Sequence, residues 1–208
     1  MQNQIDTTET STASTSAKYK TTCLIACPIF QKELESVLSE LNLAPKINYM
    51  HYTIHNSPLK MDEELQDGVD KALQTGDDIR FLVGRHCKGK RNVEEVVEDC
   101  HGKIPQGRNC IDMLLGRELT NELQKNRTSI MTPAWIRMIN QSIQEGNWSV
   151  TDARLNLGWY NKILILDTGV EPLSDELIME FYDLTQVEIE ILPIDLEHFK
   201  ALLQDLLQ

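Results

Sequence analysis

The sequence has few long apolar runs, and the longest ones, such as the KILILD segment at 162–167, are too short to cross a bilayer. The first residues, MQNQIDTTET, contain neither the basic region nor the apolar region of a secretory signal. We therefore expect a cytoplasmic protein that makes no membrane contact.

The chain also lacks a basic patch. It contains 20 Lys and Arg residues against 32 Asp and Glu residues, which gives a formal net charge of −12. Sequence-independent binding of nucleic acids requires basic residues that neutralise phosphates. This charge balance argues against a nucleic-acid partner and against an anionic membrane surface.

Several motifs that would identify a site directly are absent. There is no Gly-x-Gly-x-x-Gly, no phosphate-binding P-loop, no Cys-x-x-Cys and no His-Glu-x-x-His. The Asp-x-His-x-x-Gly arrangement of corrinoid-carrying modules is missing as well, so no motif supports a corrinoid site. The chain has five cysteines, and we expect it in a reducing compartment. Both the odd number and the compartment argue against a disulfide framework. The cysteines are therefore either buried thiols or ligands for a metal or redox group.

The hydrophobic pattern predicts the fold. Residues 1–18 are rich in Thr and Ser and predict a disordered tail, and residues 19–208 predict a single α/β domain. Within it, short apolar runs alternate with segments that repeat at helical spacing. The pattern favours a three-layer, Rossmann-like fold, in which a mainly parallel sheet carries helices on both faces.

Three cysteines follow predicted strands and predict a site. Binding sites in parallel sheets form beyond the carboxyl ends of the strands. Cys27 closes the first strand, Cys87 follows the third, and Cys110 opens a helix for which Asn109 is the expected N-cap. A position in the first turn of a helix is expected to lower the pKa of the Cys110 thiol.

Other residues are sorted by the same rule. His55 lies after the second strand and His86 beside Cys87, so both are candidate metal ligands. Asp167 and Thr168 close a later strand and are candidate cofactor contacts. The remaining two cysteines are expected elsewhere: Cys23 lies four residues before Cys27 on a strand, and Cys100 belongs to the apolar side of its helix.

The blocks IACPIFQKEL, GRNCIDMLLGREL, MTPAWIRMI and RLNLGWYNKILILDTGVEPLSDELIMEFYDLT, in this order, resemble the family called domain of unknown function 1638 over roughly residues 22–205. The resemblance implies an anaerobic or methanogenic setting beside corrinoid-dependent methyl transfer, with methyltransferases or corrinoid proteins as partners. It also implies three recurrent cysteines, which match Cys27, Cys87 and Cys110. In relatives a histidine next to the second cysteine follows it, so the resemblance carries over Cys87 and not His86.

Three functions remain open at this stage. The first is an accessory protein that binds zinc or an iron–sulfur cluster through its cysteines. The second is an enzyme for methyl or thiol transfer that uses a reactive cysteine, with zinc or without a metal. The third is a partner-binding module in which the cysteines are only buried. Whether the chain is an enzyme is undecided by its sequence.

Overall fold

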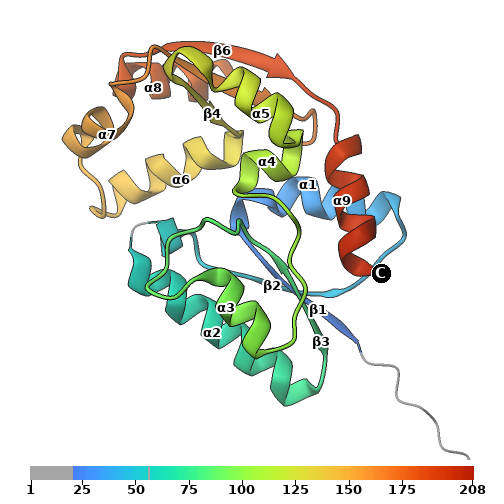
Figure 1. Ribbon diagram of the computed structural model, residues 1–208. Helices are drawn as coiled ribbons and strands as arrows, with labels where there is room; N and C mark the ends of the chain where they lie inside the picture. Colours follow the sequence, from blue (N-terminus) through green and yellow to red (C-terminus); the bar gives the residue numbers. More distant parts are fainter. Residues whose placement is uncertain (1–20, 56) are drawn as a thin grey trace, which may run out of the picture.

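The computed structural model describes residues 21–55 and 57–208, so the predicted tail at 1–18 lies outside the described residues. The described strands form two parallel sheets of three strands, with the orders β2–β1–β3 and β4–β5–β6 (Figure 1). The first sheet contains β1 (Thr22–Ala26), β2 (Lys46–Tyr49) and β3 (Asp78–Leu82). The second sheet contains β4 (Thr128–Met131), β5 (Lys162–Asp167) and β6 (Glu188–Pro193).

The first sheet alternates with helices along the chain, as its sequence pattern predicts. These elements are η1 (Pro28–Phe30), α1 (Gln31–Glu40), η2 (Tyr52–His55), α2 (Pro58–Thr75) and α3 (Val93–Asp99). Gly76 ends α2 with a left-handed φ of 70°, a conformation that glycine adopts without a steric penalty. At the edge of this sheet, Lys103 forms one parallel bridge with Arg80.

The second sheet is accompanied by a longer series of helices. They are α4 (Cys110–Leu115), α5 (Arg117–Leu123), η3 (Lys125–Arg127), α6 (Pro133–Gln144), α7 (Val150–Leu157), α8 (Asp175–Thr185) and α9 (Glu197–Leu207). Thr132 caps α6 by accepting a hydrogen bond from the N–H of Trp135, and Pro133 occupies the first helical position. The region 150–157, which has a weak helical pattern, forms α7.

The core continues from one sheet to the other. Ile130, Leu164 and Leu166 point to the larger cluster, which includes the buried side chains of the first sheet, whereas Ile163 and Ile165 point to a second cluster with α6, α7 and α8. This alternation along β5 places apolar layers on both faces of the second sheet. The predicted parallel α/β fold is confirmed, and its strands are divided between two sheets.

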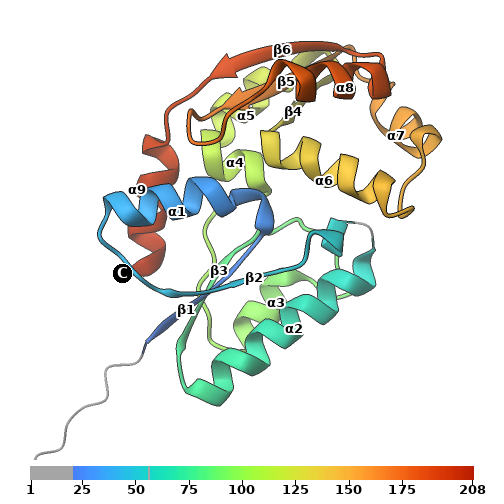
Figure 2. The same ribbon diagram turned by 180° about the vertical axis from the view of Figure 1, so that it is seen from behind.

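The C-terminal helix returns to the first half of the chain. Both views show α1 and α9 between the two sheets (Figures 1 and 2). The rings of Phe30 and Phe199 stack there with centroids 5.3 Å apart, and the buried Arg80 donates from Nε to the carbonyl of Leu206 at 3.0 Å. None of the described helices is long and apolar enough to span a bilayer.

Candidate functional site

Cys27 and His55 meet at the carboxyl edge of the first sheet. Cys27 directly follows β1, and its backbone N–H donates to the carbonyl of Leu82 on β3 at 3.0 Å. His55 ends η2, the short helix that follows β2. The Sγ of Cys27 lies 3.7 Å from the Nε2 of His55. The two side chains therefore adjoin, although 28 residues separate them.

Cys87 is brought to the same edge by a loop that is held against the segment before α4. The N–H groups of Arg85 and His86 donate to the carbonyls of Gly107 and Arg108 at 3.1 and 2.9 Å. Gly84 permits this approach, because a Cβ at this position would stand 2.7 Å from the Arg108 carbonyl oxygen and 3.1 Å from the sulfur of Cys87. The close packing of these loops places Cys87 beside Cys110.

Cys110 begins α4 and is buried. The predicted cap is confirmed: Asn109 Oδ1 accepts from the N–H of Asp112 at 3.0 Å. The expectation of a lowered Cys110 pKa is wrong. A hydrogen bond with Cys27, burial and the charge of an ionised Cys27 together raise the pKa of Cys110 well above 9.0, and they outweigh the stabilisation by the helix start.

Cys87 and His55 are also held in their neutral forms. Burial raises the pKa of Cys87 to about 12, and repulsion from an ionised Cys110 adds to the shift. Burial lowers the pKa of His55 to about 4. At neutral pH the thiols of Cys87 and Cys110 thus stay protonated, and the imidazole of His55 is neutral. A neutral imidazole is the form that binds a metal ion, whereas the thiols would lose their protons only to a bound cation.

We call Cys27, Cys87, Cys110 and His55 the thiol–imidazole cluster. Within residues 21–55 and 57–208, no group of three or more His, Cys, Asp or Glu side chains already stands in a metal-holding arrangement. The Cys27–His55 pair nevertheless has a suitable spacing. Bonds of about 2.3 Å to sulfur and 2.0 Å to nitrogen at a tetrahedral angle separate the two ligand atoms by about 3.5 Å. The observed separation is 3.7 Å.

The remaining candidate residues are exposed or already form hydrogen bonds with other groups of the protein. The side chain of His86 is exposed, on the surface beside Cys87. Thr168 donates to Glu33 Oε1 at 3.1 Å, and Asp167 Oδ1 accepts from the N–H of Gly169 at 2.9 Å. Cys23 lies toward the amino end of β1 and packs in the core, and Cys100 follows α3 and packs against the core, as the sequence predicts for Cys100.

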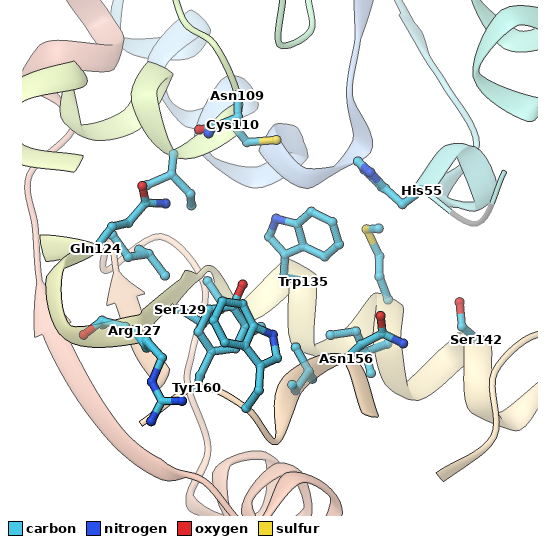
Figure 3. Close-up of a pocket in the computed structure, with 18 of the residues that line it drawn as sticks. His55, Asn109, Cys110, Gln124, Arg127, Ser129, Trp135, Ser142, Asn156 and Tyr160 are labelled. Atoms are coloured by element: carbon cyan, nitrogen blue, oxygen red, sulfur yellow. The ribbon is translucent and has the colours of Figure 1, made fainter. Parts of the chain in front are cut away.

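A cavity of about 770 Å³ extends from the cluster along β4 and α6. Figure 3 shows the sulfur of Cys110 and the ring of His55 pointing toward each other near Trp135, on the wall of this cavity. The rings of His55 and Trp135 are 4.5 Å apart between centroids. The lining comprises His55, Asn109, Cys110, Ile111, Gln124, Arg127, Thr128, Ser129, Ile130, Met131, Trp135, Met138, Ile139, Ser142, Trp148, Asn156, Leu157, Trp159 and Tyr160.

The aromatic part of this cavity is not among the sites expected from sequence. All three tryptophans of the chain line it, together with Tyr160. A signal was present, because these four residues fall within 135–160 in a chain with only 6% aromatic residues. Their spacing along the chain alone does not distinguish a cavity wall from ordinary core packing.

These features define a parallel α/β protein with a thiol–imidazole cluster at a sheet edge and a cavity beside it. Residues 49–203 match the family described as protein of unknown function, DUF1638. The match covers most of the chain, which therefore belongs to this family. His55, Cys87 and Cys110 lie within the matched range, whereas Cys27 precedes it. No curated protein and no solved structure gives a significant match.

Proposed function

We propose that this protein binds a metal ion or metal cluster through Cys27, Cys87, Cys110 and His55. The observation that carries the proposal is the 3.7 Å separation of Cys27 Sγ and His55 Nε2, with two further thiols at the same sheet edge. Three sulfur donors and one imidazole suit zinc or an iron–sulfur cluster. Binding would require Cys87 and Cys110 to lose their protons and turn their sulfur atoms toward the metal.

The raised thiol pKa values favour metal binding over a metal-free nucleophilic cysteine. A nucleophilic cysteine attacks as its thiolate and usually has a lowered pKa. The pKa of Cys87 is instead about 12, and that of Cys110 is also raised, by Cys27 and by burial. A bound cation reverses this balance because it stabilises the thiolate directly.

The position of the cluster favours a site that remains accessible. Cys110 and His55 line the large cavity, and His55 and Cys87 line a smaller one of about 220 Å³. A metal held here would face a volume in which a small molecule can reach it. Metal sites with an open coordination position activate water or polarise ligands, whereas closed sites only stabilise a fold. With the three cysteines as ligands and the fourth position left to a substrate in place of His55, the zinc would have such an open position, so a zinc-dependent transfer enzyme is the second candidate.

A second part of the proposal concerns the cellular setting that the family resemblance implies. In it the protein acts in the cytoplasm of an anaerobe as an accessory to corrinoid-dependent methyl transfer, with methyltransferases or corrinoid proteins as partners. This part is tested by size-exclusion chromatography of the protein with a purified corrinoid methyl-transfer protein. Separate elution of the two proteins would reject the proposed partnership without affecting the proposed metal site.

The metal proposal is tested by anaerobic purification followed by metal analysis, the absorption spectrum and titration with Co²⁺. We expect about one metal site per chain and, with Co²⁺, intense sulfur-to-metal charge-transfer bands. Cys27→Ser, Cys87→Ser and Cys110→Ser should each weaken binding strongly. Cys23→Ser and Cys100→Ser are matched controls that should retain it. Equal binding by all five variants, or no binding by the wild type, would reject the proposal.

A further inference from the structure

We propose that the large cavity binds a small planar organic anion, with its rings against the tryptophans and its acidic group paired with Arg127. This inference goes beyond the metal centre and does not depend on whether a metal is bound. The volume of about 770 Å³ lies within the range of small-molecule sites.

The aromatic side chains carry the first part of the inference. On the cavity wall Trp135 lies beside His55, and Trp159 and Tyr160 form a tilted pair with centroids 4.3 Å apart. Trp159 is 54% exposed, although it is a large apolar side chain on the cavity wall. Aromatic side chains that present their faces to an open cavity favour flat, conjugated ligands through offset stacking.

The charge of the lining carries the second part. The chain has 32 Asp and Glu residues, yet none of the described residues that line this cavity is acidic. Arg127 is the one residue of that lining with a permanent charge. An aromatic site without a carboxylate has no ion-pair partner for an organic cation, whereas the guanidinium offers paired N–H donors to a carboxylate, sulfonate or phosphate.

The backbone holds Arg127 at this position in an unusual conformation. Asn126 and Arg127 have left-handed φ values of 58° and 55°, which residues with a Cβ rarely adopt in succession. Asn161 stabilises the turn: its backbone N–H donates to the Arg127 carbonyl at 3.0 Å, and its side-chain amide donates to the Asn126 carbonyl at 2.9 Å. The guanidinium of Arg127 donates to Asn161 Oδ1 at 2.5 Å. This partner is neutral, so it orients the guanidinium and leaves its charge available to an anion.

The proposal is tested with two fluorescent probes of similar shape, anilinonaphthalene sulfonate, which is anionic, and N-phenylnaphthylamine, which is neutral. Metal-free wild-type protein is titrated with each probe, and quenching of tryptophan emission gives the affinity. We expect saturable binding of the sulfonate at one site per chain. Arg127→Gln should weaken sulfonate binding about tenfold and leave binding of the neutral probe within about twofold.

Two further variants separate the charge effect from the stacking effect. Trp159→Ala should weaken both probes, because it removes an aromatic wall that each probe uses. Arg91→Gln is the matched control, since Arg91 pairs with Asp99 away from this cavity and its loss should change neither affinity. Circular dichroism and melting curves establish that each variant is folded.

The proposal would be overturned if Arg127→Gln bound the sulfonate as tightly as the wild type. It would also be overturned if the aromatic cation N-methylquinolinium bound more tightly than the sulfonate. Either result is independent of the metal proposal, because the titrations use metal-free protein and the metal assay uses no organic ligand.

Discussion

The carboxyl ends of the two sheets differ in what their side chains do. At the first sheet, the thiol–imidazole cluster adjoins two cavities, and burial raises the pKa of Cys87 to about 12 and lowers the pKa of His55 to about 4. At the second sheet, Thr168 and Asp167 are already bonded to Glu33 and to the backbone. The same topological rule selects both edges from the sequence. In the proposed account the first edge offers donors to a ligand, whereas the second edge uses its polar groups to join α1 to β5.

The largest expected effect comes from removing a thiol at the first edge. Zinc should raise the melting temperature of the wild-type protein, with a stabilisation of about 2.7 kcal/mol when free zinc is 100 times the Kd. Cys110→Ser should lose this stabilisation because one of the proposed sulfur ligands is gone. Thr168→Val, at the second edge, should keep it. Differential scanning calorimetry with and without zinc measures the stabilisation of the wild type and of both variants. Equal stabilisation of the two variants by zinc would contradict the proposal that only the first edge binds the metal.

The next effect concerns the second edge without metal. Thr168→Val removes the hydrogen bond to Glu33, whose side chain is almost fully buried. We expect a loss of about 1–3 kcal/mol in the free energy of unfolding, because a buried carboxylate loses a donor. Urea denaturation measures the loss. The control is Thr151→Val, because Thr151 is exposed on α7. Thr75 is also exposed but is unsuitable as a control, because its hydroxyl donates a hydrogen bond to Asp77. A change below about 0.5 kcal/mol for Thr168→Val would contradict the structural role of this edge.

A smaller, pH-dependent effect is expected for Glu33. Burial raises the pKa of Glu33 above its usual 4.5, with a further contribution from Glu171, and this outweighs the opposing hydrogen bonds and the charge of Arg137. The folded protein therefore binds this proton more tightly than the unfolded chain. The resulting stabilisation is complete below pH 4.5 and is lost as the pH rises through the raised pKa.

Glu33→Gln, which retains an oxygen acceptor for Thr168, has no such proton to lose. The stability of the variant relative to the wild type should therefore increase with pH across this window and stay constant above it. Thermal melts of both proteins between pH 4 and pH 8 check this expectation. A stability difference that is independent of pH would mean that Glu33 does not titrate differently in the folded protein.

The smallest effect is expected for the exposed histidine. His86→Ala should change the free energy of unfolding by no more than about 0.5 kcal/mol and leave zinc affinity within about twofold, because its side chain is exposed on the surface. His55→Ala should weaken zinc binding at least tenfold. Competition with a chromogenic chelator compares the two variants. A larger loss of zinc affinity in His86→Ala than in His55→Ala would mean that His86, and not His55, binds the metal.

Much of this arrangement could be predicted from the chain. Short apolar runs and helical repeats predicted the parallel α/β fold, and the carboxyl-end rule selected Cys27, Cys87 and Cys110 together with His55. The division into two sheets could not be predicted, because alternation of strands and helices does not reveal which strands are hydrogen-bonded neighbours. The pKa of Cys110 was mispredicted because the sequence shows its helix start but not its burial beside Cys27.

The cavity escaped prediction for a related reason. Its wall combines Trp135 on α6, Trp148 before α7 and Trp159 after it, and their common orientation depends on how these helices pack against β4. A sequence gives the spacing of these aromatic residues along the chain but not the volume left between the elements that carry them. The left-handed turn that positions the Arg127 guanidinium could not be predicted either, because Asn126 and Arg127 form it without a glycine.

The most direct test of the central claim is X-ray absorption spectroscopy at the metal edge of the zinc-loaded protein. The proposed site predicts a first shell dominated by sulfur at about 2.3 Å, with nitrogen at about 2.0 Å from one imidazole. The sulfur contribution should fall in Cys27→Ser and Cys110→Ser and persist in Cys23→Ser. A first shell composed only of oxygen and nitrogen would contradict a thiolate-bound metal at the carboxyl end of the first sheet.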